Sequence, residues 1–263
     1  MSPDILGPNS GLVVGARALL KARDRREERL FLVEGPQAVR EALAYGFVQT
    51  LFVDHTRSDA LGEFLDAPVR TELVSPRAIE VLTETNAPQG VVAVCAMPRQ
   101  TLDDILAGNP TFVVVGVGIN DPGNLGTIIR TADAAGADAV CITAGSADAY
   151  NGKTIRSTAG SLFHLPVVQG LDEADTLEAL RAAGLASFGL AGQGATDLFA
   201  LDEQRLQQPL ALWLGSEAHG LAPALVSRLD AAVAIPMPGR AESLNVATAG
   251  AVAMYAVTRA RLR

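Results

Sequence analysis

Two loops near the C-terminal end of the chain carry the residue types from which a ligand site is built. The apolar run 210–214 stops at Gly215-Ser216-Glu217, and the apolar run 231–235 stops at Pro236-Met237-Pro238-Gly239. Glycine and proline at this density fix the backbone and expose its amides and carbonyls. Loops at the carboxyl ends of neighbouring strands form the usual ligand crevice of an α/β sheet. The sequence therefore predicts a site at these two loops.

A helix is expected directly after the second loop. Residues 243–257 are mostly small, and Ser243 is a good N-cap residue. The free amides of a helix N-terminus favour anionic or polar ligand groups. This helix start therefore joins the two loops in the predicted site.

A third stretch combines a turn with a helix that carries a cation. Asp121-Pro122-Gly123 is a turn signal, Asn124 is expected to cap the following helix, and Arg130 lies six residues further on. A purely structural alternative is that Asn124 only caps while Arg130 pairs with Asp133 or Asp138. The residues alone leave both interpretations open.

Two nucleotide-binding signatures fail on their spacing. Gly116 and Gly118 are followed by Asp121 where a dinucleotide fingerprint needs its third glycine, and the loop between Gly145 and Gly152 is too long for a P-loop. There is no HExxH or CxxC pattern, so no metal site is predicted. Of the histidines, His164 is expected to be structural, whereas His219 lies in a site loop and is a candidate for a direct role.

The elements that must position these residues alternate between strands and helices. Strands expected at 30–33, 48–53, 69–74 and 90–96 alternate with helices, which predicts a small α/β domain over residues 1–97. Residues 98–110 contain a short helical piece and are predicted to be a linker. Residues 111–263 alternate again, beginning with an expected strand at 112–119, so this domain is predicted to have a parallel sheet covered on both faces.

The composition limits which binding partners and which cellular compartment are expected for this protein. The 263-residue chain has a formal net charge of −8, but residues 17–29 hold six basic side chains against three acidic ones. This basic run is either a solvated helix face or an RNA contact. Cys95 and Cys141 lie in apolar runs and are expected to be packed thiols rather than a disulfide. No apolar run reaches the length of a membrane helix, so no membrane partner is expected and the predicted location is the cytoplasm.

Three ordered motifs resemble those of the SpoU (TrmH-like) family of RNA ribose 2′-O-methyltransferases in the SPOUT superfamily. The first has the pattern Asn-x-Gly-x-x-x-Arg and consists of Asn124, Gly126 and Arg130. The second is Leu214-Gly215-Ser216-Glu217 with Gly220. The third is Ile235-Pro236-Met237 followed by Ser243-Leu244-Asn245-Val246. Many members have a serine where this chain has Ala247, so one secondary hydroxyl contact is missing.

The first domain is similar to the substrate-binding domain that many family members carry. The resemblance lies in the stretches FLVEGPQAVREAL, residues 31–43, and NAPQGVVAV, residues 86–94. Small ribosomal proteins that bind kink-turns in RNA are similar too. The resemblance therefore extends over nearly the whole chain.

The resemblance implies a fold, a cofactor and a reaction. The fold is an α/β domain with a parallel sheet and a deep trefoil knot, preceded by a small α/β RNA-binding domain. The cofactor is S-adenosyl-L-methionine, and the reaction methylates a ribose 2′-hydroxyl in RNA, with 23S ribosomal RNA favoured by the first domain. The protein is expected to be a homodimer that associates through the knot region. Two alternatives are a transfer RNA methyltransferase and a catalytically silent RNA-binding or assembly protein.

The resemblance also assigns roles to individual residues. The catalytic set is Arg130, Asn124, Glu217, Ser243 and Asn245. The residues expected to bind the cofactor are Leu214, Gly215, Ser216, Ile235, Met237, Ser243, Leu244 and Asn245. The side chains expected to bind RNA are Arg17, Arg23, Arg25, Arg26, Arg156 and Arg240. Because a guanidinium stays protonated in proteins, Arg130 is expected to hold a phosphate and polarise the 2′-oxygen rather than act as a base.

Overall fold

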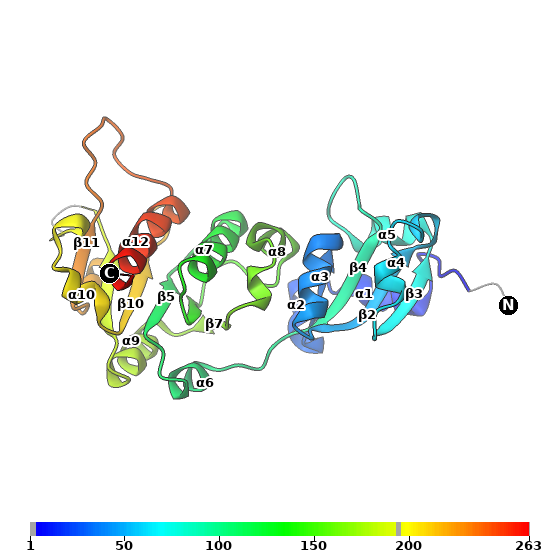
Figure 1. The fold of residues 1–263 in the computed structure, drawn as a ribbon, viewed down its shortest axis with the longest axis horizontal. Helices are drawn as coiled ribbons and strands as arrows, with labels where there is room; N and C mark the ends of the chain where they lie inside the picture. The colour runs from blue at the N-terminus through cyan, green and yellow to red at the C-terminus, as the bar shows by residue number, and fades with distance from the viewer. Residues whose placement is uncertain (1–3, 193–195, 263) are drawn as a thin grey trace. The chain divides into compact units, whose positions relative to one another are not determined.

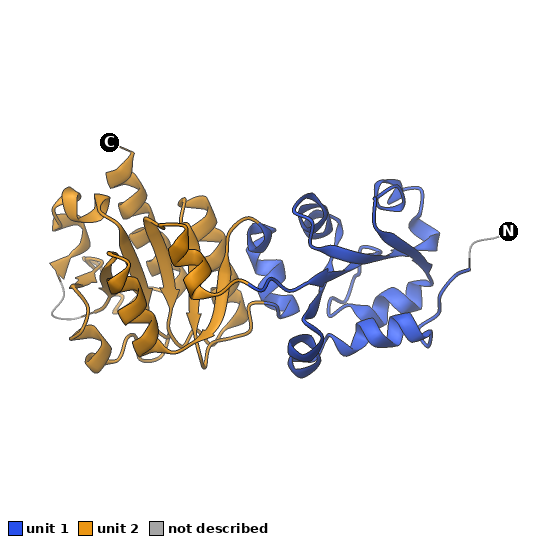
Figure 2. Cartoon of the chain, turned by 90° about the horizontal axis from the view of Figure 1, so that it is seen from below, with its two compact units in different colours: residues 1–99, 150–163 blue, residues 100–149, 164–263 orange. Residues whose placement is uncertain are grey.

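The chain folds into two compact units. The computed structural model describes residues 4–192 and 196–262. Unit 1 comprises residues 1–99 and 150–163, and unit 2 comprises residues 100–149 and 164–263 (Figures 1 and 2). Each unit is built around its own β-sheet.

Unit 1 has a mixed four-stranded sheet in the order β1-β4-β2-β3. Strand β4 runs antiparallel to both β1 and β2, whereas β2 and β3 are parallel. The strands are β1 (Leu30–Glu34), β2 (Val48–Asp54), β3 (Arg70–Val74) and β4 (Val91–Ala96). The helices from the same stretch are α1 (Gly11–Ala18), α2 (Ala22–Glu28), α3 (Pro36–Ala44), η1 (His55–Arg57), α4 (Gly62–Leu65) and α5 (Pro76–Leu82). All four predicted strands and the predicted helices after β1 and β3 are therefore present.

A later segment, residues 150–163, also packs into unit 1. It contains α8 (Gly152–Thr158) and η2 (Ser161–Phe163). The Phe163 ring lies 5.1 Å from the Phe47 ring and 6.4 Å from the Phe31 ring, measured between centroids, and the Tyr150 ring lies 4.9 Å from Phe31. Aromatic pairs at these separations stabilise beyond the area that they bury. The segment is thus part of the hydrophobic core of unit 1.

Unit 2 has a seven-stranded sheet in the order β7-β6-β5-β10-β8-β11-β9, and all of its pairings are parallel. The strands are β5 (Phe112–Gly116), β6 (Ala139–Thr143), β7 (Val167–Leu171), β8 (Ala186–Leu190), β9 (Thr196–Asp197), β10 (Leu210–Leu214) and β11 (Ala231–Ala234). The helices are α6 (Leu102–Ala107), α7 (Pro122–Ala134), α9 (Glu173–Ala182), η3 (Leu198–Ala200), α10 (Glu203–Gln207), α11 (Pro223–Val226) and α12 (Val246–Arg261). The predicted α/β fold with a parallel C-terminal sheet is confirmed.

Side chains that alternate along the central strands bury both faces of this sheet. Ala211 and Trp213 belong to a core cluster that also contains residues of α6, α9 and α11. Leu214 points to the other face, where its side chain would be 2.9 Å from a Cβ placed on Gly250 of α12. Because only a hydrogen occupies that position, α12 can pack closely over the end of β10.

Three local predictions were wrong, and each has a physical reason. The strand predicted to reach Ile119 ends at Gly116, because a turn with Gly118 at φ +62° follows it. Helix α7 is capped by Asp121, whose carboxylate accepts from the Asn124 amide, so Asn124 is not the cap. Helix α12 is capped by Asn245 rather than Ser243. Both Asn124 and Ser243 are thereby free of a capping role.

The remaining structural expectations concern the cysteines and the membrane. Cys95 and Cys141 are buried free thiols, and burial raises the pKa of Cys141 to about 12 and that of Cys95 further still. The interpretation as packed thiols is confirmed. Among residues 4–192 and 196–262 no helix is long and apolar enough to cross a membrane.

The packing of residues 150–163 into unit 1 can be tested by truncating Phe163. Phe163 is 4% exposed, so Phe163→Ala should lower the free energy of unfolding of unit 1 by about 3 kcal/mol through lost burial and a cavity. Tyr45→Ala in the same unit is the matched control, because the Tyr45 side chain is 53% exposed and its loss should cost much less. Urea unfolding followed by circular dichroism measures both, and equal losses would contradict this packing.

Candidate functional site

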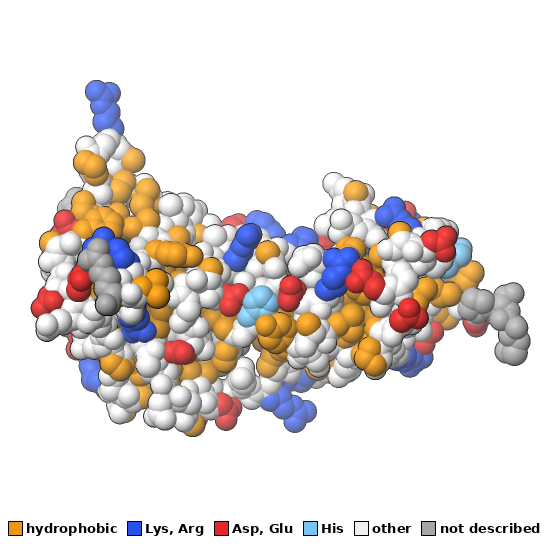
Figure 3. Space-filling view, in the orientation of Figure 1, with side chains coloured by type: hydrophobic (Ala, Val, Ile, Leu, Met, Phe, Trp, Pro, Cys, Tyr) orange, Lys and Arg blue, Asp and Glu red, His pale blue; other side chains and the backbone are white. Residues whose placement is uncertain are grey.

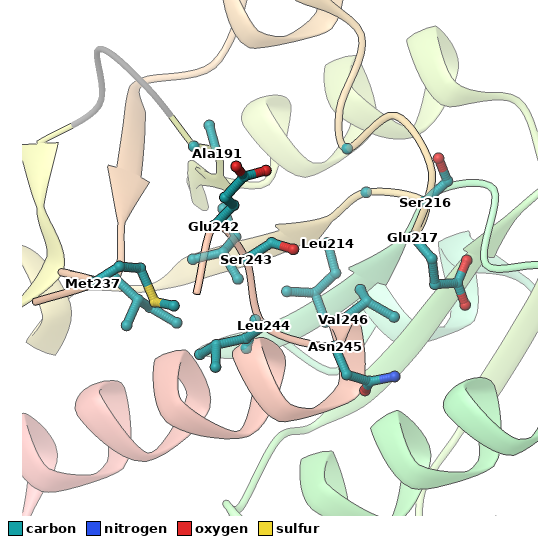
Figure 4. A pocket seen from close by; sticks show the side chains of 16 residues that line it. Ala191, Leu214, Ser216, Glu217, Met237, Glu242, Ser243, Leu244, Asn245 and Val246 are labelled. Carbon is teal, nitrogen blue, oxygen red and sulfur yellow. The ribbon is translucent and has the colours of Figure 1, made fainter. Parts of the chain in front are cut away.

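A cavity of about 410 Å³ lies at the carboxyl ends of three neighbouring strands, β10, β8 and β11 (Figure 4). The residues that line it come from the loops after these strands and from the start of α12. They are Leu190, Ala191, Gly192, Leu214, Gly215, Ser216, Glu217, Gly220, Ile235, Met237, Glu242, Ser243, Leu244, Asn245, Val246 and Ala249. The predicted crevice is therefore formed, and all eight residues predicted to bind a cofactor line it.

One wall of the cavity was not predicted from the sequence. Leu190 ends β8, and Ala191 and Gly192 follow it; β8 lies between β10 and β11 in the sheet. Because β8 precedes both strands in the chain, its central place is not visible from residue order. A Leu-Ala-Gly sequence at the end of an apolar strand was the available signal.

The loop after β10 can form only with glycine at position 215. A Cβ placed on Gly215 would lie 2.1 Å from the carbonyl carbon of Gly220 and 2.3 Å from the Leu221 nitrogen. The loop returns on itself here, with an antiparallel bridge between Ser216 and Gly220 and a 2.9 Å hydrogen bond from the Gly220 amide to the Ser216 carbonyl. A Cβ placed on Gly239, by contrast, would meet no protein atom within 4 Å.

A chain of hydrogen bonds links the three predicted motifs. The Asn124 Nδ2 donates to Glu217 Oε1 at 2.8 Å, and the Asn245 Nδ2 donates to Asn124 Oδ1 at 3.0 Å. The Asn245 Oδ1 in turn accepts from the amides of Ala247 and Thr248 at the start of α12. Helix α7, the β10 loop and α12 are thus held together by residues 93 and 121 positions apart in the sequence.

Glu217 is kept ionised by this network. Burial alone would raise its pKa, but the side chain of Asn124 and the backbone amides of Glu217, Asn120 and Asp121 together lower the pKa below its usual range. Donors that bond the charged form of a carboxylate favour that form. Glu217 is therefore an anchor for neighbouring donors and is poorly suited to accept a proton near neutral pH.

Arg130 does not make the ion pairs of the structural alternative. Asp133 bonds the ring of His164 at 2.7 Å, and Asp138 accepts from the amides of Thr111 and Phe112. Arg130 is exposed on α7, and within the described part of the chain no hydrogen bond or ion pair involves it. It does not line the cavity. Its charge is available to a ligand.

No histidine lines the cavity, and the described residues offer no metal site. His219 is exposed and contributes only its backbone amide, 3.3 Å from the Ser216 hydroxyl, and it does not line the cavity. His164 pairs with Asp133, in agreement with its predicted structural role. Among the described residues there is no cluster of His, Cys, Asp or Glu that could hold a metal ion.

The arginines predicted to bind RNA fall into three groups. Arg17, Arg23, Arg26 and Arg240 are exposed. Arg25 is a correction: it is 4% exposed, and its Nη1 donates to the carbonyls of Leu19 and Leu20 at 2.9 Å each, which fixes the turn between α1 and α2. Arg156 is bound to Glu34 and lies 3.6 Å from Glu84, so its charge is already compensated within unit 1.

Basic and acidic side chains are interspersed on one face of the molecule. On the face drawn in Figure 3, Lys and Arg side chains alternate with Asp and Glu rather than gathering in one basic patch. RNA binding through isolated arginines needs local positive potential, not a positive total charge.

The cavity fits the predicted cofactor. Its lining combines apolar side chains from Leu214, Ile235 and Leu244 with amide, hydroxyl and carboxylate groups, which suits an adenosine joined to a charged tail. Gly215 permits the close approach of backbone that hydrogen bonds to an adenine ring require. Leu214, Gly215, Ile235, Met237 and Leu244 would hold the adenosine.

Comparison with known proteins identifies the family. Residues 111–255 match the model of the SpoU rRNA Methylase family, and residues 13–93 match the MRM3-like substrate binding domain. The chain is 39% identical over 235 residues to the 23S rRNA (guanosine(2553)-2′-O)-methyltransferase RlmP of Bacillus subtilis, covering 89% of this chain and 90% of that protein. It is 38% identical over 257 residues to the 23S rRNA (uridine(2479)-2′-O)-methyltransferase of Streptomyces viridochromogenes, covering 94% and 88%.

Solved structures agree with the sequence comparison. The SpoU methyltransferase AviRb of Streptomyces viridochromogenes, in complex with AdoMet, superimposes with a TM-score of 0.86 at 36% identity and covers 97% of this chain and 99% of that chain. An AdoMet-bound rRNA methyltransferase of Sinorhizobium meliloti gives 0.84 at 31% identity, covering 97% and 98%.

The fold and the comparisons thus define an RNA methyltransferase, and the cavity lies at the carboxyl ends of its parallel sheet. The chain belongs to the SpoU rRNA methylase family. The predictions of methyltransferase activity and of S-adenosylmethionine as the cofactor are confirmed.

The contact at Gly215 predicts a selective loss of cofactor binding. Gly215→Ala should abolish measurable binding of S-adenosylmethionine, because its methyl group would overlap the Gly220–Leu221 backbone. Gly239→Ala should bind normally, since open space surrounds that position. Isothermal titration calorimetry measures both affinities. Equal affinities in the two variants would show that the loop can adapt.

The network around Glu217 predicts a pH dependence. A carboxylate with a lowered pKa contributes its interactions above the unfolded pKa and loses them as the pH falls through the folded pKa. Asn124→Ala removes one group that lowers the pKa of Glu217, so the acid limb of cofactor binding should move to higher pH than in the unmodified protein. Titrations at several pH values between about 7 and 4 measure the shift. If cofactor affinity falls at the same pH in Asn124→Ala and in the unmodified protein, Asn124 does not lower the pKa of Glu217.

Proposed function

We propose that this protein transfers the methyl group of S-adenosylmethionine to a ribose 2′-hydroxyl of 23S ribosomal RNA. The observation that carries this proposal is the hydrogen-bonded set Glu217–Asn124–Asn245, of which Glu217 and Asn245 line the cavity. The relatives named for 23S rRNA methylation and the MRM3-like substrate binding domain support the choice of RNA. Since this RNA is found in the cytoplasm, we expect the enzyme there.

The network provides a rigid frame for the reaction. When bound, S-adenosylmethionine supplies an electrophilic sulfonium methyl group. A ribose 2′-hydroxyl is a weak acid, so the site must align it with that methyl and ease its deprotonation. Asn124 and Asn245 fix the β10 loop and the start of α12 against each other, and Ser243 offers a hydroxyl at the cavity wall. Glu217 acts through Asn124 as a positioning residue.

Arg130 provides the positive charge. It is a permanent cation with no partner among the described residues, on the helix whose first turn holds Asn124. A guanidinium can bind a phosphate through paired hydrogen bonds and stabilise charge that develops on the 2′-oxygen. The proton of the hydroxyl then passes to the phosphate or to water.

The RNA contacts follow from exposure and charge. Arg17, Arg23 and Arg26 belong to unit 1, most of which matches a substrate-binding domain, and they are exposed. Arg240 is exposed in the loop between β11 and α12, the loop that also contributes residues to the cavity wall, and we expect it to contact the target strand. The revised set excludes Arg25 because it is buried, and Arg156 because it is paired.

The quaternary structure and the knot remain part of the proposal. We expect a homodimer, and the exposed apolar side chains Tyr255 of α12 and Phe199 of η3 support an interface at this face, where they line a groove of about 320 Å³. The predicted trefoil knot rests on the family resemblance. The predicted domain boundaries, 1–97, 98–110 and 111–263, likewise stay a prediction.

The role of Arg130 gives the decisive test. Arg130→Ala should lower methyl transfer by at least about 100-fold, as expected for removal of a charge-stabilising group, while calorimetry shows unchanged S-adenosylmethionine binding. Arg130→Lys should restore little activity, because an ammonium cannot make paired hydrogen bonds to a phosphate. Labelled methyl is counted in separate pools of unmodified 23S ribosomal RNA and transfer RNA.

Each outcome separates the alternatives. Label in 23S RNA that is lost in Arg130→Ala supports the proposal, and label in transfer RNA keeps the chemistry but replaces the substrate. Cofactor binding without label in either pool would favour the silent RNA-binding protein. Loss of cofactor binding in Arg130→Ala would show that this residue is structural.

A further inference from the structure

The cofactor cavity contains two charged side chains among its lining residues, and both are acidic. They are Glu217 and Glu242, and every other lining residue is neutral. In the close view of Figure 4, Glu242 lies beside Ala191, and Glu217 lies at the opposite side of the view, next to Ser216. The two carboxylates thus give the cavity a negative potential that favours a cationic occupant.

The two carboxylates differ in how the protein uses them. Glu217 accepts from Asn124 and from backbone amides, so its charge is committed to holding the loops. Glu242 is exposed, and within the described ranges it makes no hydrogen bond or ion pair. Arg240, two residues earlier, does not line the cavity and forms no ion pair with Glu242. Glu242 is therefore the carboxylate available to a ligand.

The methyl donor and its demethylated product differ in one charge. S-adenosylmethionine carries a positive sulfonium in addition to its ammonium and carboxylate, and is a net cation. Loss of the methyl leaves a neutral thioether in S-adenosylhomocysteine, whose remaining charges cancel. An anion in the cavity therefore attracts the donor more than the product, whatever it does for the groups that they share.

We propose that Glu242 is a specificity-determining residue that favours the cationic methyl donor over the neutral product. This inference rests on the proposed function only in requiring that the cofactor occupies this cavity. It assigns Glu242 no part in the methyl transfer itself. The product no longer carries the sulfonium charge, so its attraction to Glu242 is weaker and its exchange for a new donor molecule is favoured.

The test measures binding rather than activity. Calorimetry gives the affinities of Glu242→Gln and of the unmodified protein for S-adenosylmethionine, for S-adenosylhomocysteine and for an analogue with an amine in place of the sulfonium. Because the carboxylate is exposed and screened, Glu242→Gln should weaken S-adenosylmethionine and the amine analogue by about 3- to 10-fold. Binding of S-adenosylhomocysteine should change by less than about 2-fold. Added salt should reduce the difference in the unmodified protein.

The controls separate this inference from the proposed function. Glu27→Gln removes one exposed carboxylate from unit 1 and should leave all three affinities unchanged. Equal weakening of all three ligands by Glu242→Gln would show that Glu242 holds a group that they share, and no weakening would show that it does not act on them; either result overturns the inference. If the unmodified protein fails to bind S-adenosylmethionine, the proposed function fails as well.

Discussion

Three loops that lie far apart in the sequence have to keep one geometry, and the amide of Asn124 is the group that holds them. It donates to Glu217 and accepts from Asn245, so it uses both ends of its side chain. A carboxylate lacks the donor and an ammonium lacks the acceptor, so neither could replace the Asn124 amide in both contacts. The position of the β10 loop relative to α7 and α12 depends on this chemistry.

The shape of the cavity also depends on two glycines, which have no side chain. Gly215 lets the loop after β10 return against its own backbone, and Gly250 lets α12 approach Leu214. In both places a single methyl group would enter space already filled by other atoms. The crevice therefore depends on two close approaches that the hydrogen bonds then fix in register. Rigid loops of this kind reduce the entropy lost when a flexible ligand is bound.

Local signals in the sequence were sufficient for the strands other than the short β9 and for most of the cavity. Apolar runs that end in glycine and proline located β10 and β11, and the ordered motifs located Asn124, Glu217 and Asn245. These features can be recognised in the sequence because each one depends on a few consecutive residues. The central place of β8 in the sheet is set by tertiary packing, so residue order could not reveal the wall at Leu190–Gly192. Charge was harder to interpret, because Arg25 and Arg156 look like their exposed neighbours in the sequence, but one is buried against carbonyls and the other is paired with acidic groups. A formal charge predicts an RNA contact only when the side chain is free, and partners from distant segments decide that.

The placement of residues 150–163 means that the two units cannot be separated by a single cut in the chain. The chain leaves unit 1 after residue 99, returns to it at 150 and leaves again after 163. Expression of residues 100–263 alone would therefore remove the aromatic neighbours that cover Phe163 and Tyr150. Any exchange of the substrate-binding domain between relatives would have to carry this inner segment along, because unit 1 consists of two pieces of sequence rather than one.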